Sequence, residues 1–530
     1  MNFWDRCRNK LKKLNRTENP SPEKEVKVLE KKLEENLIKI KDELGDSSDL
    51  VIRYFELGTE SPAAAAVVYI SGLVDDKKAN KFIEESLKVE DPLKEAAYSQ
   101  KDMFDIVRDR ALSINNIVMV SDWNKLLLTI LNGETVILLD GYNEAITANT
   151  KGGQTREITE PSTQLVIRGP KVAFTESIGT NVALIRRYIK SPNLRVETQQ
   201  VGSITKTDTA LVYIKGTVNE KVLREVKKRL NKIEVEDIIE SGNIEEYIQD
   251  NAFTPFPTIY NSERPDAVVG NLLEGRIAVI VDGTPFVLVV PALFIQFFQS
   301  PSDYYQNYLI GSFLRMLRII SYIISILTPS LYIALTTFHP QMIPTSLLIS
   351  LAAQHEGVPF PVIVEVLIME FTFEIIREAG LRMPRAVGQA VSIVGALVLG
   401  QAAVQAGIVS PTTIIVVAFT GIASFATPSY NIAVAPRLLR FLMMILAGGF
   451  GLYGVFVALF ILIAHLTSLR SFGIPYLSPF APFIPADFKD TIIRRPLWSL
   501  DSRPRLVSQQ NNKRQARGNK PSPSDNHNGN

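Results

Sequence analysis

Ionisable side chains inside an otherwise apolar stretch are the residues of this sequence best placed to do chemistry. Residues 361–385 read PVIVEVLIMEFTFEIIREAGLRMPR and hold four glutamates and three arginines. A carboxylate that faces hydrocarbon is costly, so these side chains cannot point into lipid. Each one must pair with a cation inside the protein or lie beside a path that water and cations can enter.

The spacing of these charges favours a helix held by ion pairs. Glu370, Glu374 and Arg377 fall on one helical face. Residues three or four apart on a helix are neighbours, so Glu374 can pair with Arg377 and Glu378 with Arg382. An interior helix stabilised by such pairs is the structural interpretation, and acids that line or fringe a cation path are the functional one. The candidates for this acidic site are Glu365, Glu370, Glu374 and Arg377.

The next segment, residues 386–407, reads AVGQAVSIVGALVLGQAAVQAG and carries a small residue at every fourth position. Small residues at this spacing let a second helix backbone approach closely, so packing is the structural interpretation. The packing candidates are Gly388, Ser392, Ala396 and Gly400. Valines on the opposite side would face lipid or the axis of an oligomer, where an apolar ring can gate by dewetting. The pore or gate candidates are Val387, Gln389, Val391, Val394 and Val398.

These segments need a membrane-spanning framework. Residues 319–338 carry no charge over 20 positions, which is long enough to cross the roughly 30 Å hydrocarbon core of a bilayer. Residues 412–427 and 441–464 are further apolar spans. Arg315 and Arg318 precede the first span and place the N-terminal half in the cytoplasm. The sequence therefore predicts an α-helical transmembrane domain of four to five spans.

The positive-inside rule and the span count disagree. Arginines that favour the cytoplasmic side follow the glutamates and precede the last span, and the C-terminal tail is basic too. These arginines are Arg377, Arg382, Arg385, Arg437 and Arg440. Five crossings from a cytoplasmic N-terminus would leave the tail outside. Either one apolar segment does not cross, with the glutamate-rich segment the first suspect, or the rule misleads here.

The soluble half contains similar stretches twice. Residues 67–77 read VVYISGLVDDK and residues 211–221 read LVYIKGTVNEK, 144 positions later. Two more pairs keep the same order at nearly the same offset, namely 49–58 with 193–202 and 133–141 with 275–283. Short runs rich in Val, Ile and Tyr indicate strands, and apolar residues at helical spacing after them indicate helices. We predict two similar α/β subdomains with buried sheets.

Each predicted subdomain ends a buried strand with Asp-Gly. The aspartates are Asp140 and Asp282. They can line a crevice, which would be functional, or they can serve turn chemistry, which would be structural.

Composition excludes several classes of function. The formal net charge of +2 gives no sign of nucleic-acid binding. The single cysteine, Cys7, cannot form an intrachain disulfide, which fits a reducing cytosolic face. The four histidines have no metal-ligand spacing, and the sequence has no Gly-rich phosphate loop, GxSxG or HExxH motif. We expect no enzymatic activity, no metal and no cofactor.

The chain divides into six predicted parts. Its start contains an amphipathic helix that packs on the next domain or, alternatively, forms a coiled coil between chains. Its last thirty or so residues are polar, basic and predicted to be disordered. The parts are a charged tail with the amphipathic helix (1–45), α/β subdomain 1 (46–150), α/β subdomain 2 (151–290), an interfacial linker (291–312), the transmembrane domain (313–466) and a C-terminal tail (467–530).

Three stretches resemble the A-subunit family of the GerA-type spore germination receptors. They are FTESIGTNVALIRRYIKSPNL (174–194), RPDAVVGNLLEGRIAVIVDGTPFVLVVP (264–291) and EFTFEIIREAGLRMPRAVGQAVSIVGALVLGQAAVQAGIVSP (370–411). The resemblance covers about residues 45–500 and includes the order of soluble part, spans and tail. The spore-protein A/F-type accessory subunit shares much of this pattern and is the rival within the family.

The resemblance implies a function that the residues alone do not reach. Such a subunit is a multi-pass protein of the spore inner membrane with its N-terminal half in the cytoplasm. It works with a transporter-like B subunit, which binds the nutrient, and with a C-subunit lipoprotein. The A subunits form a homo-oligomer, a pentamer, that opens as a nutrient-gated channel and releases monovalent cations. The resemblance assigns no single side chain to the pore.

Other classes of protein stay open. A transporter would more often show broken helices related by an inverted repeat, whereas the repeat found here lies in the soluble half. A scaffold would use its membrane part only as an anchor. A membrane-anchored enzyme would need a convergent acid, base and nucleophile, and the sequence offers none.

Overall fold

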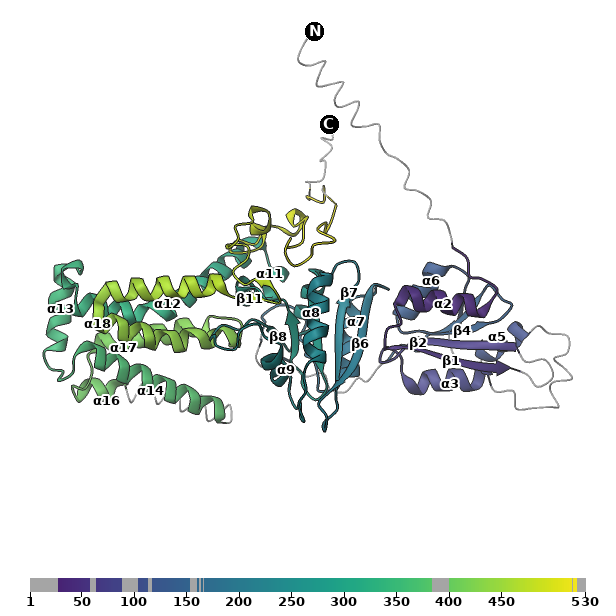
Figure 1. Ribbon diagram of the computed structural model, residues 1–530, viewed down its shortest axis with the longest axis horizontal. Coiled ribbons are helices and arrows are strands. Elements are labelled where there is room, and N and C mark those ends of the chain that lie inside the picture. The colour runs from purple at the N-terminus through teal and green to yellow at the C-terminus, as the bar shows by residue number, and fades with distance from the viewer. Residues whose placement is uncertain are drawn as a thin grey trace, which may run out of the picture. The chain divides into compact units, whose positions relative to one another are not determined.

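The computed structural model divides the chain into two compact units, Met1–Gly153 and Gln154–Asn530 (Figure 1). The residues that the structure describes are 27–57, 63–87, 103–112, 117–152, 160–161, 164, 166–383, 400–516 and 518–521.

The first unit is a five-stranded antiparallel sheet with helices on both faces. The strand order is β1-β2-β4-β5-β3, with α2 and α6 over one face and α3 and α5 over the other (Figure 1). The strands are β1 (Leu50–Leu57), β2 (Ala63–Ile70), β3 (Ile117–Val120), β4 (Thr135–Leu139) and β5 (Ala145–Ala148), and the helices are α2 (Leu33–Leu44), α3 (Asp76–Leu87), α5 (Met103–Leu112) and α6 (Trp123–Leu131). The central strands β4 and β5 are buried along their whole length. The predicted amphipathic helix is α2, which buries its leucine stripe.

The second unit begins with a sheet of the same design. Its order, β6-β7-β9-β10-β8, matches the first sheet strand for strand, and β6 begins 144 residues after β1. The strands are β6 (Leu194–Val201), β7 (Thr207–Ile214), β8 (Tyr260–Ser262), β9 (Ile277–Val281) and β10 (Val287–Val290), and the helices are α7 (Ile178–Tyr188), α8 (Glu220–Asn231), α9 (Ser241–Ile248) and α10 (Pro265–Leu273). This equal topology is what a duplicated module predicts. We call the two copies the first and the second module.

The Asp-Gly pairs anchor equivalent helices in the two modules. The Asp140 carboxylate accepts a hydrogen bond from the backbone N–H of Leu33, and Asp282 accepts one from Ile178, both at 2.9 Å. Leu33 and Ile178 open α2 and α7, where backbone N–H groups have no partner within the helix. The aspartates therefore have a structural role at these helix N-termini, and the alternative of a ligand crevice stays a prediction.

The linker after the second module is part of the core. It forms the 3-10 helix η1 (Phe294–Phe298) and α11 (Ser302–Tyr305). Phe297 is buried, and its ring centroid lies 5.6 Å from that of Tyr260 and 6.4 Å from that of Tyr476. The predicted interfacial element is therefore wrong for this stretch, because its phenyl rings pack between the second sheet and the C-terminal segment rather than on a membrane surface.

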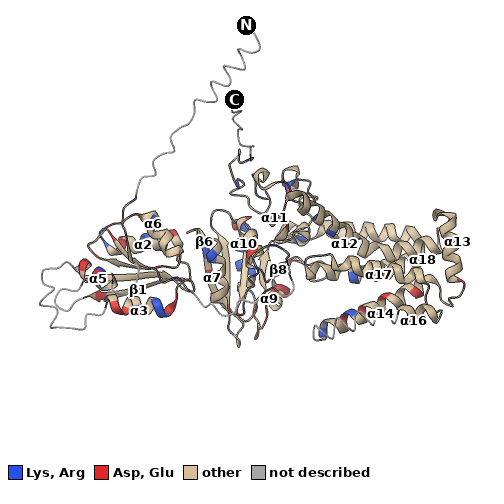
Figure 2. Cartoon of the chain, turned by 180° about the vertical axis from the view of Figure 1, so that it is seen from behind, with Lys and Arg blue, Asp and Glu red and all other residues tan. Residues whose placement is uncertain are grey.

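Apolar helices form the rest of the second unit. They are α12 (Tyr308–Thr337), α13 (Thr345–His355), α14 (Val362–Arg382), α16 (Gly400–Gln405), α17 (Pro411–Phe425) and α18 (Tyr430–Ser468), with the 3-10 turn η2 (Pro340–Met342). Figure 2 shows that charged residues are sparse on α12, α17 and α18. Among the described residues, two helices, α12 and α18, are long and apolar enough to cross a membrane, and α17 is a shorter apolar helix. Most of the span predicted over 386–407 lies outside the described residues, so the count of four to five stays a prediction.

Helix α18 doubles back at Gly451. This residue has φ 62° and ψ −143°, a conformation that glycine adopts far more readily than other residues. A Cβ added at Gly454 would collide with the carbonyl oxygen of Leu446, so the two residues lie side by side. In a continuous helix that separation of eight residues would span about 12 Å. The helix therefore has two antiparallel arms that meet at Gly451, and the single span predicted over 441–464 is wrong. Hydropathy cannot detect a turn inside an uninterrupted apolar run.

The C-terminal segment packs on the second module. It holds β11 (Arg470–Ser471), β12 (Ile474–Pro475), η4 (Pro485–Lys489) and η5 (Leu497–Ser499). Val507 is buried, and the Ser508 hydroxyl donates to the carbonyl of Thr217 at 2.7 Å. The predicted disorder is therefore wrong for residues 501–516, because a few buried contacts fix a stretch whose composition is polar.

Candidate functional site

The glutamate-rich segment forms α14, and the structure divides its buried charges between two clusters. Glu365 and Glu370 are both fully buried. Glu374 and Arg377 are mostly buried, with side chains 16% and 11% exposed. Glu365 and Glu374 lie roughly 13 Å apart along the helix axis. The four predicted residues thus share one helix but not one site.

The first group, which we call the arginine–glutamate cluster, contains Glu370, Glu374, Arg377, Arg437 and Arg440. Arg437 Nε donates to Glu374 at 2.9 Å, and Arg440 Nη1 lies 3.1 Å from Glu370. Arg440 also contacts Glu374, and Arg377 lies 3.8 Å from it. Because Arg437 and Arg440 belong to the first arm of α18, the cluster ties this arm to α14.

Arg377 extends the cluster to α17. Its Nη2 donates to the Ser424 hydroxyl at 2.9 Å, and its guanidinium lies 4.4 Å from the ring centroid of Phe425. The predicted pair with Glu374 forms, and so does the pair of Glu378 with Arg382, at 2.8 Å. The second pair is exposed and contributes little to stability.

Glu370 is the least satisfied member of the arginine–glutamate cluster. Neither of its carboxylate oxygens has a hydrogen-bond partner among the described residues, although Arg440 Nη1 lies 3.1 Å away. Buried ions are stabilised only where good geometry and further hydrogen bonds offset the loss of water. Glu370 is therefore a buried carboxylate whose charge is balanced by Arg440 but whose oxygens lack hydrogen bonds among the described residues.

Glu365 belongs to a second cluster at the other end of α14. Its Oε1 lies 2.9 Å from His355 Nδ1. Its Oε2 accepts hydrogen bonds from the Ser410 N–H at 2.9 Å and from the Thr413 hydroxyl at 3.1 Å. The Tyr332 hydroxyl lies 3.0 Å from His355 Nε2. Sequence reasoning missed His355 and Tyr332, because contacts across a turn and between helices leave no periodic signal.

The predicted pore and packing residues fall mainly outside the described part of the chain. Gly400 is described and buried, and a Cβ added there would lie 3.8 Å from Ile414 of α17. Its packing role stays a prediction, as does the role of the others. The candidates outside the described residues are Val387, Gly388, Gln389, Val391, Ser392, Val394, Ala396 and Val398.

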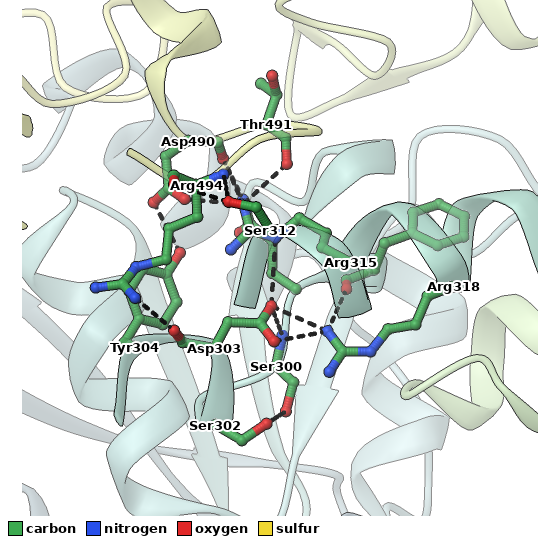
Figure 3. Close-up of polar contacts among 12 residues, drawn as sticks. Ser300, Ser302, Asp303, Tyr304, Ser312, Arg315, Arg318, Asp490, Thr491 and Arg494 are labelled. Atoms are coloured by element: carbon green, nitrogen blue, oxygen red, sulfur yellow. Dashed lines mark hydrogen bonds and ion pairs between the residues drawn. The ribbon is translucent and has the colours of Figure 1, made fainter. Parts of the chain in front are cut away.

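A further buried ionic group, which we call the Asp303 cluster, lies where α11, the start of α12 and the C-terminal segment meet (Figure 3). The fully buried Asp303 carboxylate lies 3.2 Å from Arg315 Nε and 2.8 Å from Arg318 Nη1. Arg315 Nη1 lies 2.8 Å from Asp490, and Arg494 Nη1 donates to the carbonyl of Asp303 at 2.7 Å. Sequence reasoning took Arg315 and Arg318 only as positive flanks of a span.

Tyr304 completes the Asp303 cluster. Its hydroxyl donates to Asp490 Oδ2 at 2.7 Å. Burial, together with the charge of Asp490, raises the pKa of Tyr304 well above its usual value. A phenol is protonated at physiological pH in any case, so Tyr304 donates this hydrogen bond there. The bond holds the chain just before α12 begins.

Two α/β modules followed by apolar helices that enclose buried charges indicate a membrane-associated protein. The family model described as Bacillus/Clostridium GerA spore germination protein matches residues 38–506. The chain belongs to the GerA family of spore germination proteins.

Individual relatives match over most of their length. Spore germination protein KA of Bacillus subtilis (strain 168) is 51% identical over 503 residues, which cover 94% of this chain and 91% of that protein. Spore germination protein GerLA of Bacillus cereus is 41% identical over 479 residues, 90% of this chain and 96% of that one. The crystal structure of the N-terminal domain of the A subunit of the Bacillus megaterium spore germinant receptor GerK3 is 43% identical and covers 51% of this chain and 99% of that chain, with a TM-score of 0.41.

Proposed function

We propose that this chain is the A-type subunit of a nutrient-triggered spore germination receptor. It resides in the spore inner membrane with its α/β half in the cytoplasm and has no enzymatic activity. Membership of the GerA family supports this role, since the family model and the similar proteins are described by spore germination.

The path of the chain supports a cytoplasmic position for both flanks. Helix α12 begins beside the Asp303 cluster, and His465 at the end of α18 makes a 2.9 Å contact with Thr254 of the second module. Gly451 lies beside Phe338 at the opposite end of α12. If each arm of α18 crosses the membrane, the five predicted crossings become six, which is an even number. The conflict between the span count and the positive-inside rule then disappears.

In this proposal the subunits assemble as a pentamer that conducts monovalent cations when a transporter-like B subunit binds the nutrient, with a C-type lipoprotein as the third component. The arginine–glutamate cluster carries the proposal, because it places a poorly satisfied carboxylate, Glu370, between α14 and α18 in an apolar half. Large apolar side chains on α17 and α18 are exposed in the single chain and suit lipid or neighbouring copies. They include Phe419, Phe450, Phe456 and Phe460.

The alternative is an accessory scaffold or a transporter-like subunit of the same complex. In that case the buried ion pairs of α14 only hold the helices together, which is their structural interpretation. The geometry of the arginine–glutamate cluster is compatible with this role, so flux measurements must separate the two.

Potassium flux from liposomes that hold the chain with its B-type and C-type partners tests the proposal. We expect nutrient-dependent flux that changes severalfold in Glu370→Gln and in Val391→Ala. Glu378→Gln, on the same helix but exposed, is the matched control and should leave the flux unchanged. An absence of flux from the complete complex would favour the scaffold, and flux that saturates with a transported substrate would favour the transporter.

A further inference from the structure

A cavity separate from α14 and its clusters lies between the second module, the linker and the C-terminal segment. Its volume is about 330 Å³, which is within the range of small-molecule sites. Helix α10 and α11 form much of its wall, and Leu497 and Arg514 of the C-terminal segment complete it. Four tyrosines border the space, Tyr188, Tyr260, Tyr304 and Tyr305.

Arg276 is the lining residue that points to the charge of a ligand. Its side chain is buried, and Nη1 is held by Asn271 and lies 3.1 Å from Glu274. Its Nε has no partner among the described residues. A buried guanidinium donor without a partner is unfavourable by itself, and a carboxylate is the best-matched acceptor for a guanidinium.

The acids of the cavity are already engaged. Asp266 lies 2.8 Å from Arg264 Nη2, and the Tyr305 hydroxyl donates to it at 2.9 Å. Glu274 pairs with Arg276. The charge left over in the lining is therefore the positive charge of the exposed Arg514. Together with the unpartnered Nε donor of Arg276, it favours an anion over a cation.

The rest of the cavity wall favours an anion that also carries an apolar group, which we call its apolar body. Aromatic rings bury large apolar areas and stack on other rings with defined geometry. The tyrosine rings and Leu273 and Leu497 supply such a surface around the charged end. A simple inorganic anion would leave these walls uncovered.

We propose that this cavity binds a small organic carboxylate with an apolar body. The carboxylate binds Arg276, with Arg514 at the border, and the body packs on the tyrosine rings. Tyr304 connects the cavity to the Asp303 cluster, because it lines the cavity and its hydroxyl donates a hydrogen bond to Asp490. An occupant therefore contacts a residue that fixes the start of α12, whether or not the chain conducts ions.

Two glycines provide a matched pair of variants. Gly270 lines the cavity from α10, and a Cβ added there meets nothing within 4 Å. Leucine at this position extends from that open Cβ position into the cavity and has a higher helix propensity than glycine. Gly179 in α7 also has open space within 4 Å but does not line the cavity. Gly270→Leu should block the site, and Gly179→Leu should not.

Isothermal titration of the full chain in detergent with benzoate tests the proposal. We expect saturable binding to the wild type and to Gly179→Leu, and binding at least about tenfold weaker to Gly270→Leu and Arg514→Gln. Benzamide, which lacks the carboxylate, and inorganic phosphate, which lacks the apolar body, should each bind at least about tenfold more weakly than benzoate. The thermal midpoint of each variant checks that it is folded.

Any one of four results would overturn the proposal. These are no binding of benzoate to the wild type, equally tight binding of benzoate to Gly270→Leu and the wild type, equal affinities for benzamide and benzoate, and equal affinities for phosphate and benzoate. The first two remove the site, the third removes the role of Arg276, and the fourth removes the apolar body from the ligand class.

Discussion

The two α/β modules share a strand order but differ in what their cores join. The described core of the first module ends within its own helices and strands, with residues such as Phe82, Phe104 and Ile137. The core of the second module continues into the apolar helices and the C-terminal segment, through Tyr322 and Tyr476. The described core of the first module is thus its own, whereas the second module shares one hydrophobic core with the apolar helices.

A matched pair of glycines shows the same difference at a single position. Gly133 and Gly275 precede β4 and β9 with φ of 81° and 94°. A Cβ at either would lie 2.7 Å from a carbonyl oxygen, that of Leu73 or that of Thr217. Only Gly275 is also covered by Ser508, which would lie 2.9 Å from the added Cβ. The second copy keeps the turn of the first and adds a contact with the C-terminal segment.

Asp303→Asn is expected to give the largest effect and would break the link that only the second module has. The change removes a buried charge that pairs with the buried Arg315 and the half-buried Arg318. Disrupting a buried pair typically costs about 3–5 kcal/mol. Differential scanning fluorimetry of the full chain in detergent should show a clear fall in the thermal midpoint.

Glu35→Gln in the first module is the control for Asp303→Asn. The ion pair of Glu35 with Lys32, at 2.9 Å, is exposed, and pairs of this kind contribute little. We expect no measurable shift of the midpoint. Equal shifts from the two changes would show that the Asp303 cluster is no more stabilising than a surface pair.

Gly133→Ala and Gly275→Ala compare the equivalent turns of the two modules, and we expect losses of stability of intermediate size. Both changes place a side chain in the left-handed region and against a carbonyl, which costs on the order of 1–3 kcal/mol. Gly275→Ala should in addition displace Ser508 and make the C-terminal segment more sensitive to limited proteolysis. Equal proteolysis of both variants would argue that the segment does not depend on this contact.

Asp140→Ala and Asp282→Ala test what the modules have in common, with the smallest expected effect. Each change removes the acceptor for the first N–H of a helix, a loss of about 1 kcal/mol. Chemical denaturation should give similar losses for both variants. A loss several times larger for one of them would mean that the two Asp-Gly turns are not equivalent.

Local patterns made part of this structure predictable from the sequence. The repeated strand sequences predicted two similar modules, because a run of adjacent apolar residues is enough to indicate a buried strand. The helical spacing of Glu374 with Arg377 predicted their ion pair for the same reason. Such features depend on residues a few positions apart.

Features that depend on distant residues could not be predicted. Arg315 pairs with Asp490 of the C-terminal segment. Glu365 contacts His355 and Thr413, which come from other helices. The reversal at Gly451 lies inside an apolar run, so composition gave no sign of it. Only part of the arginine–glutamate cluster could be predicted, because Arg437 and Arg440 lie on a different helix from the glutamates.

Hydrogen exchange tests most directly whether the second module, and not the first, is coupled to the apolar helices. The measurement compares the full chain in detergent with a fragment of residues 27–298. We predict that the amides of β10 lose protection by about tenfold or more in the fragment, because their core is then open on one side. The amides of β2 and β4 should be unchanged. Equal protection of β10 in the two samples would contradict a shared core.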